Sequence, residues 1–381
     1  MKKIMTRLLS LVLLGAFIPG FVLADSWYLE DGDITVNATE TSQIVSQGGT
    51  SKPDSNPIIS TRAPGSSGTG ATNNTVTITA AENATANVTL ENVNIGTGTR
   101  GGAAITTSGE GNVNIELDGT NTVQSGNDHA GVEKKGDGTL TITDENKDGS
   151  LTATGGTWGA GIGGARNESA SNITIEGGNV EATGGYSGAG IGGGEGTWGV
   201  NITISDGKVT ATGSGAGAGI GGGYAGIGKG ITIEGGEVTA QGDTGGAGIG
   251  GGANGIGSDV TISGDAQVKV QGGRANEYWP KGAAIGNGGA AKTDGNEVSP
   301  NTSDLTVEGF IQYYSQSDDI KTAAPYKTIE GQKGDHSWNA GEVTTPATCT
   351  TPGVRTYTCT KNPAHTKTEP IPALNHLFGA Y

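Results

Sequence analysis

The sequence predicts an all-β protein: a right-handed parallel β-helix (β-solenoid) with three short strands per 29-residue coil, followed by a small C-terminal β unit. Composition is the first observation behind this prediction. Glycine supplies 73 of 381 residues, charged residues 16% and aromatic residues 5%, which is unlike an ordinary helical or sandwich core. Glycine at this level would predict disorder if it were aperiodic. Here it is periodic, so the sequence favours an ordered repeat.

The repeat is the second observation, because three apolar columns share one step of 29 residues. The first column contains Ile162, Ile191, Ile220 and Ile249. The second contains Ile173, Ile202, Ile231 and Val260. The third contains Leu151, Val180, Val209 and Val238. A period between about 20 and 50 residues indicates a solenoid.

Each repeat has room for three strands and three corners but for no helix. Ile173 to Ile175, Val180 to Ala182 and Ala189 to Ile191 alternate with period two, which predicts strands with one buried face. Pairs such as Gly177-Gly178 and Gly184-Gly185 separate them and permit the positive φ angles that corners require.

Weaker coils flank the regular repeats. Val88 to Leu90, Val113 to Ile115 and Leu140 to Ile142 occupy the first-strand position before them. Leu305 to Val307 resumes the pattern 45 residues beyond Val260, which implies an insertion of 16 residues within 274–303. We expect about eight coils and a stack of roughly 35–40 Å.

Four segments divide the chain. Residues 1–24 combine Lys2, Lys3 and Arg7 with an apolar run ending at Ala24, which is typical of a bacterial Sec signal peptide. Residues 25–71 are expected to form an N-terminal cap and loop, 72–329 the β-helix, and 330–381 a small C-terminal β module that is truncated if this sequence is a fragment. No second apolar stretch approaches the roughly 20 residues of a membrane helix, so the mature protein is expected to be exported and not membrane-embedded.

The charge argues against some partners. The formal net charge is −16, and removal of residues 1–24 takes away three basic and no acidic residues, leaving −19. Such a chain is not expected to bind nucleic acid or an anionic membrane.

Two features of the outward faces suggest surfaces. Single glycines in the GAGIGG segments are expected to point outward and to leave one face without side chains: Gly161, Gly190, Gly219 and Gly248. This face could be a docking surface for a polymer. The alternative explanation for these glycines is repeat duplication together with tight corner geometry. Threonine columns resemble the rows of β-solenoid ice-binding proteins, but Glu181, Lys269, Gln241 and Gln271 interrupt them. Threonine also favours exposed strands, so ice binding is a weaker alternative.

Aromatic residues fall mainly at corners, where exposed rings can stack on the apolar faces of sugars or serve ordinary loop packing. The candidate glycan contacts are Trp158, Tyr186, Trp198, Tyr224, Tyr278 and Trp279. The partner that these residues suggest is a polysaccharide or a glycan of a host or cell surface.

Catalysis is not expected. A polysaccharide lyase or hydrolase needs clustered acids, whereas Glu176, Asp206, Glu234, Asp259 and Asp265 are scattered. His129 is interpreted as a loop residue. A lyase-like β-helix therefore stays a weaker alternative.

The sequence contains one candidate metal-binding loop. Asp144, Asn146 and Asp148 place oxygen donors at alternating positions with Gly149 sixth, as in the first half of a Ca²⁺ loop. Gly155 stands where a bidentate Glu belongs and strands flank the loop. An Asx-rich turn is favoured over a structural Ca²⁺ site, and no other cofactor is expected.

The C-terminal segment holds both cysteines, Cys349 and Cys359. Export would permit a disulfide, while His365 and His376 would complete an alternative Zn²⁺ set. From Trp338 to His376 the segment resembles a short module of surface proteins from gut Gram-positive bacteria, with its W-x-x-G-x-V, A-T-C-T-x-x-G, T-Y-T-C and I-P-A-L-x-H elements. The GAGIGGG and ITIEGG coils resemble the β-helical part of such proteins, which are sometimes grouped with carbohydrate-binding β-helices.

Together these features predict a non-enzymatic, adhesin-like binding protein, secreted or at the cell surface, with carbohydrate as its ligand. The main alternative is a structural stalk or scaffold of a surface adhesin. Neither a sortase signal nor an autotransporter barrel follows the module, so we expect a released protein or a fragment.

Overall fold

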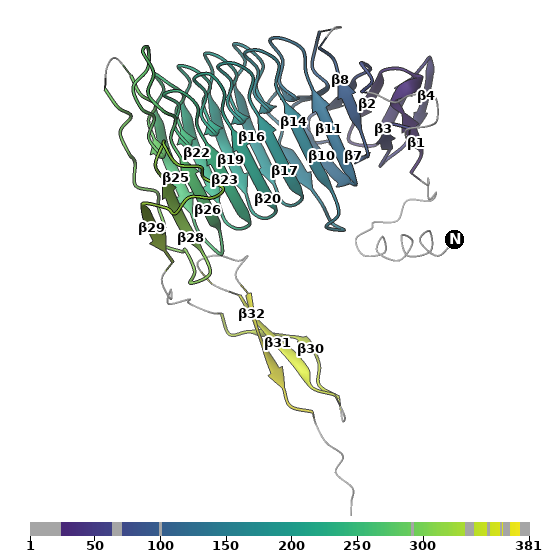
Figure 1. Cartoon of the computed structure of the whole chain (residues 1–381). Coiled ribbons are helices and arrows are strands. Elements are labelled where there is room, and N and C mark those ends of the chain that lie inside the picture. Colours follow the sequence, from purple (N-terminus) through teal and green to yellow (C-terminus); the bar gives the residue numbers. More distant parts are fainter. Residues whose placement is uncertain are drawn as a thin grey trace, which may run out of the picture.

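The computed structural model describes residues 24–62, 71–98, 101–290, 293–331, 339–348, 351–358, 360 and 366–373. Within these residues the chain is all-β apart from one 3-10 turn, Leu29–Asp31 (Figure 1). None of the described segments forms a helix long and apolar enough to cross a membrane. The predicted signal peptide lies almost entirely outside the described residues.

Three sheets run along the stack, here called A, B and C. Sheet A consists of β1 (Ser26–Tyr28), β5 (Ile58–Ser60), β7 (Thr85–Glu91), β10 (Asn112–Asp118), β13 (Leu140–Thr143), β16 (Ala170–Ile175), β19 (Gly199–Ile204), β22 (Gly228–Ile233) and β25 (Gly257–Ile262). Sheet C consists of β8 (Asn94–Gly96), β11 (Thr120–Gln124), β14 (Ser150–Thr154), β17 (Asn179–Thr183), β20 (Lys208–Thr212), β23 (Glu237–Gln241), β26 (Gln267–Gln271), β28 (Phe310–Tyr314) and β29 (Lys327–Glu330).

Sheet B consists of β2 (Ile34–Ala38), β3 (Gln43–Gln47), β4 (Thr50–Pro53), β6 (Val76–Ala80), β9 (Ile105–Gly109), β12 (Val132–Lys134), β15 (Ile162–Gly163), β18 (Ile191–Gly192), β21 (Ile220–Gly221), β24 (Ile249–Gly250) and β27 (Ile285–Gly286). From β7 to β27 the chain passes through sheets A, C and B in turn, which makes seven complete turns with partial turns at both ends. The predicted parallel β-helix with three strands per coil is confirmed.

The apolar columns pair as the 29-residue period predicts. Ile162 pairs with Ile191, and Val180 with Val209, in parallel register. Their side chains are fully buried, and each stacks on its counterpart in the next turn. Burial of one such side chain contributes about 1.5–3 kcal/mol, so the columns supply most of the stabilisation available to a chain with so few large apolar residues.

The expectation that Gly161, Gly190, Gly219 and Gly248 leave a bare outer face is wrong. All four are buried. A Cβ atom on Gly190 would lie 2.5 Å from the backbone nitrogen of Thr212 in β20 and 2.7 Å from the carbonyl oxygen of Gly219. The alternative of tight corner geometry therefore explains these glycines, because the backbones of sheets B and C approach too closely for any side chain.

The corners use glycine for two reasons. Gly178 has a φ of +85°, as a left-handed corner requires. Gly185 needs space instead, because a Cβ there would lie 1.8 Å from the carbonyl oxygen of Gly156. In that corner the positive φ falls on Ser187, at +72°, and on the equivalent Trp158, at +73°.

Antiparallel strands close both ends of the stack. At the N-terminal end β2, β3 and β4 form an antiparallel meander on sheet B, and at the other end β29 pairs antiparallel with β28. Strands that turn back in this way cover the exposed edges that a parallel stack leaves. A separate antiparallel sheet, β30 (Glu342–Thr345), β31 (Gly353–Thr358) and β32 (Thr366–Ile371), confirms the predicted C-terminal β unit.

The predicted strand at Leu305 to Val307 is wrong. Leu305 makes only an isolated bridge to Gly264, beyond the end of β25, and Val307 is exposed. The next strand of the stack is β28, which pairs with β26 in sheet C. The extra residues already enter the chain before β27, because Ile285 follows its partner Ile249 by 36 residues rather than 29.

The enclosed glycines give a direct test of the packing. We expect Gly190→Ala to lower the free energy of unfolding by about 1–3 kcal/mol, because the added methyl group meets backbone atoms that cannot rotate away. Gly98→Ala is the matched control, since that exposed glycine has an ordinary φ and no atom near its Cβ position. Urea unfolding followed by circular dichroism measures both, and equal midpoints for the two variants would contradict the close approach.

Candidate functional site

Two rows of loops meet over the outer side of sheet B, and together they are called the loop ridge. The loops from sheet C to sheet B contain residues 125–131, 155–161, 184–190, 213–219, 242–248 and 272–284, and those from sheet B to sheet A contain 164–169, 193–198, 222–227 and 251–256. Hydrogen bonds between turns join the rows. The N–H groups of Glu195, Tyr224 and Ala253 donate to the carbonyl oxygens of Trp158, Ser187 and Ala216, each at 2.8 Å.

The loop ridge is therefore an ordered surface rather than a set of free loops. The strands of sheet B beneath it are only two residues long in the regular turns. Short strands bring the two loops of each turn together, and the repeated backbone hydrogen bonds align them from one turn to the next. Side chains at equivalent loop positions consequently form columns along the stack.

Trp158 is held on the loop ridge by charge. The Arg166 guanidinium lies 4.2 Å from the centre of the indole ring, within the range of a cation–π contact. Arg166 also pairs with Asp128 at 3.4 Å and with Glu195 at 3.0 Å. One face of the indole is thus occupied, and Trp158 is half-buried.

Tyr224 and Trp279 form an aromatic pair, with ring centres 5.2 Å apart and planes tilted by 57°. Trp279 belongs to the long loop between β26 and β27, and its Cβ lies over Gly245. The side chain of Asn276 fixes this loop by accepting hydrogen bonds from the N–H groups of Tyr278 and Trp279. The structure thus joins Tyr224 to a residue of the other corner, two turns further along the stack.

Three of the six predicted aromatic contacts are open to solvent. Tyr186 is 65% exposed, Trp198 50% and Tyr278 72%. Trp198 heads a column that continues to Ile227 and to Ile256, which is 56% exposed. These positions combine an apolar surface with an ordered backbone, which is the combination that sugar stacking uses.

A buried carboxylate under the loop ridge was missed by the sequence analysis. The side chain of Glu133 is 1% exposed; it lies 2.7 Å from Nδ1 of His129 and 2.9 Å from Nζ of Lys135. His129 is a loop residue as expected, but it also makes this contact. Both carboxylate oxygens are engaged, so the arrangement fastens the loops on either side of β12.

The signal for this contact was present in the repeat. Glu133 occupies the position that glycine takes in the regular turns, because it pairs with Gly163. Burial of Lys135 lowers the pKa of its ammonium group, but the neighbouring carboxylates of Glu133 and Glu168 together outweigh this effect and raise the pKa overall.

The predicted Ca²⁺ donors lie in an exposed turn. The Asp144 carboxylate accepts hydrogen bonds from the N–H groups of Asp148 and Gly149, both at 3.2 Å, and the Asn146 side chain accepts from Asp148 at 3.3 Å. This is the hydrogen bonding of an Asx turn. Among the described residues, no group of three or more His, Cys, Asp or Glu side chains is placed to hold a metal. A Ca²⁺ ion here stays a prediction.

Two other predicted features can be placed. Thr152, Thr210 and Thr239 lie in one parallel register on sheet C, with Glu181 between the first two and Lys269 after the third. The charged residues thus break the threonine column where the sequence indicated. Cys349 and Cys359 lie outside the described residues, as do His365 and His376.

Comparison with known families agrees with the fold. The sequence profile of the family described as "Beta helix repeat" matches residues 147–166, 173–195, 202–224 and 231–253, which fall in four successive turns. These matches agree with the stacked sheets: the four regular turns are similar to β-helix repeats, and the fold is a parallel β-helix. No curated protein and no solved structure matches the chain.

The buried carboxylate predicts a difference between two glutamates that share one lysine. We expect Glu133→Gln to lower the free energy of unfolding by about 2–3 kcal/mol, because His129 and Lys135 lose a charged partner. Glu168→Gln should change it by less than about 0.5 kcal/mol, because that side chain is 47% exposed. Urea unfolding of the two variants checks this, and a Glu133→Gln protein as stable as the parent would show that the carboxylate does not fasten the loops.

Proposed function

We propose that this chain is a non-enzymatic, exported binding protein that uses the loop ridge to hold carbohydrate. The observation that carries the proposal is the set of exposed rings, Tyr186, Trp198 and Tyr278. Hydrogen bonds between turns order the backbone at Tyr186 and Trp198, and the Asn276 side chain holds the backbone at Tyr278. Rings fixed in this way lose little conformational entropy when a ligand binds. A β-helix repeat fold is also compatible with an adhesin-like role.

Export and cell-surface placement belong to the same proposal. They are supported by the basic and apolar character of residues 1–24 and by the resemblance of 338–376 to a surface-protein module. A strongly acidic chain would remain soluble outside the cell and would be repelled by other polyanions.

A structural stalk is the second candidate. The regular turns from β13 to β24 repeat with little change on the outer faces of sheets A and C, where threonine recurs. A spacer needs length and solubility, and such faces supply both. The two candidates differ in whether the aromatic columns of the loop ridge bind anything.

A glycan array with the purified chain separates these candidates. We expect binding to a subset of neutral or acidic glycans, and a loss of about tenfold or more when Tyr186, Trp198 and Tyr278 are changed together to alanine, since each sugar–ring contact contributes about 1 kcal/mol. Tyr28→Ala is the control, because Tyr28 is an exposed aromatic residue at the opposite end of the stack.

The stalk interpretation predicts a different array. The parent chain would bind no glycan, or the triple variant would bind as well as the Tyr28→Ala control. Either result would contradict recognition of carbohydrate by the loop ridge.

A further inference from the structure

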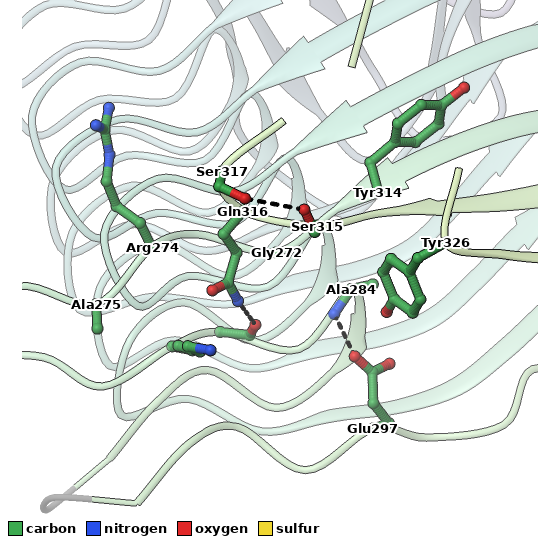
Figure 2. A pocket seen from close by; sticks show the side chains of 12 residues that line it. Gly272, Arg274, Ala275, Ala284, Glu297, Tyr314, Ser315, Gln316, Ser317 and Tyr326 are labelled. Atoms are coloured by element: carbon green, nitrogen blue, oxygen red, sulfur yellow. Dashed lines mark hydrogen bonds between the residues drawn. The ribbon is translucent and has the colours of Figure 1, made fainter. Parts of the chain in front are cut away.

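A cleft of about 630 Å³ opens at the C-terminal end of the stack, and it is called the end cleft. One wall is the loop 272–284, which carries Arg274 and Lys281. The other is the segment 314–317 with Tyr326 (Figure 2). A smaller polar hollow adjoins it and shares Arg274 and Gln316. The volume lies within the range of about 300–1,000 Å³ typical of small-ligand sites.

The walls of the end cleft are held in place by buried hydrogen bonds. Gln271, which is 3% exposed, donates its side-chain amide to the carbonyl oxygens of Ser315 and Asp318, the latter at 2.9 Å. The amide of Gln316 reaches across to the carbonyl oxygen of Gly282 at 3.4 Å. The end cleft is therefore a formed cavity between two fastened segments.

The charged side chains of the end cleft differ in whether they already have partners within the protein. Arg274 and Lys281 are exposed, and neither makes an ion pair within the described part of the chain. Glu297 is already engaged, because one of its oxygens accepts the N–H group of Ala284 at 2.7 Å (Figure 2) and the other accepts the N–H group of Ile285 at 3.1 Å.

The aspartates of the adjoining hollow are engaged as well. Asp243 accepts backbone N–H groups of Gly215 and Thr244. Asp318 accepts the hydroxyl of Ser315, and Asp319 accepts the hydroxyl of Thr322. The hydrogen bonds at Asp319 lower the pKa of that carboxyl, so it stays ionised. The carboxylates keep their charge, but their oxygens already have donors, whereas Arg274 and Lys281 make no ion pair among the described residues.

Tyr326 supplies an aromatic surface at the wall of the end cleft. It is 60% exposed, and its ring packs against Tyr313 with the centres 6.4 Å apart. Its backbone N–H donates to the carbonyl oxygen of Tyr313 at 2.9 Å, which fixes the ring at the wall. Gln316 and Ser317 add an amide and a hydroxyl to the lining of the end cleft.

We propose that the end cleft binds one acidic sugar unit, a hexose ring that bears a carboxylate. Arg274 and Lys281 pair with the carboxylate, Tyr326 lies against the C–H face of the ring, and Gln316 and Ser317 bond its hydroxyl groups. The ligand class rests on the proposed carbohydrate function, but none of Tyr186, Trp198 and Tyr278 lines the end cleft, although Tyr278 lies on the loop 272–284 that forms one wall. The two proposals can therefore fail separately.

Calorimetric titration of the full chain with a matched pair of disaccharides tests this proposal. Cellobiouronic acid and cellobiose differ only by the carboxylate. We expect the acid to bind about tenfold or more tightly than cellobiose, and Arg274→Ala or Lys281→Ala to remove that preference. Lys269→Ala is the control, because Lys269 lies on the outer face of sheet C in β26. Tyr326→Ala should weaken binding of both sugars, whereas Tyr326→Phe should retain it.

Three results would overturn the proposal. Equal affinity for the two disaccharides would remove the role of the cations. Displacement of the acid by inorganic sulfate at the same concentration would identify a site for bare anions only. Absence of binding at about 10 mM of either sugar would remove the site altogether. Array binding that is unchanged in the ridge variants, with the preference for cellobiouronic acid retained, would count against the loop ridge alone.

Discussion

The structure depends on one constraint, the spacing of about 4.8 Å between hydrogen-bonded turns. Every turn must repeat the backbone path of the turn before it, so any atom that points along the stack or into a corner meets the same atom of the neighbouring turn. Gly190 shows the consequence, because a single methyl group there would lie within 2.5 Å of the backbone of β20. Glycine is required at such positions by lack of space, and this requirement explains much of the composition.

The same constraint determines where variation is possible. Core columns repeat isoleucine and valine, and corner columns repeat glycine. Side chains of different kinds enter outside these columns. They lie on the outer faces of strands, as Glu181 and Lys269 do in sheet C, and in the loops, as in the column that contains Arg166, Glu195, Tyr224 and Ala253. The loop ridge and the end cleft both consist of such positions. The proposed recognition uses the part of the repeat that stacking leaves free.

Much of the fold could be predicted from the sequence because stacking makes the period visible in the residues. The columns of Ile162 and Val180 gave the correct register, since equivalent residues must pair between turns. The period does not show whether Gly161 points outward or into the corner. Alternation predicts an outward residue only within an extended strand, and the strand in sheet B begins at Ile162, so Gly161 lies in the corner.

The sites were predicted less well, for a physical reason. Contacts such as Tyr224 with Trp279 join residues 55 positions apart through an irregular loop, and the loop length hides the pairing from any periodic pattern. Glu133 was visible as an exception to the glycine column, but its partners became clear only when the loops on both sides of β12 were placed. In such sequences, a residue that departs from the repeat is therefore a candidate for a specific contact.

The central claim is that the loop ridge is part of the hydrogen-bonded stack rather than a row of mobile loops. Hydrogen–deuterium exchange of the full chain, resolved to short peptides, measures this most directly. The account predicts that the N–H groups of Glu195, Tyr224 and Ala253 exchange as slowly as those of the neighbouring strands, because each bonds to a carbonyl group of another turn. Rapid exchange at 193–198 and 222–227, with protected strands on both sides, would contradict it.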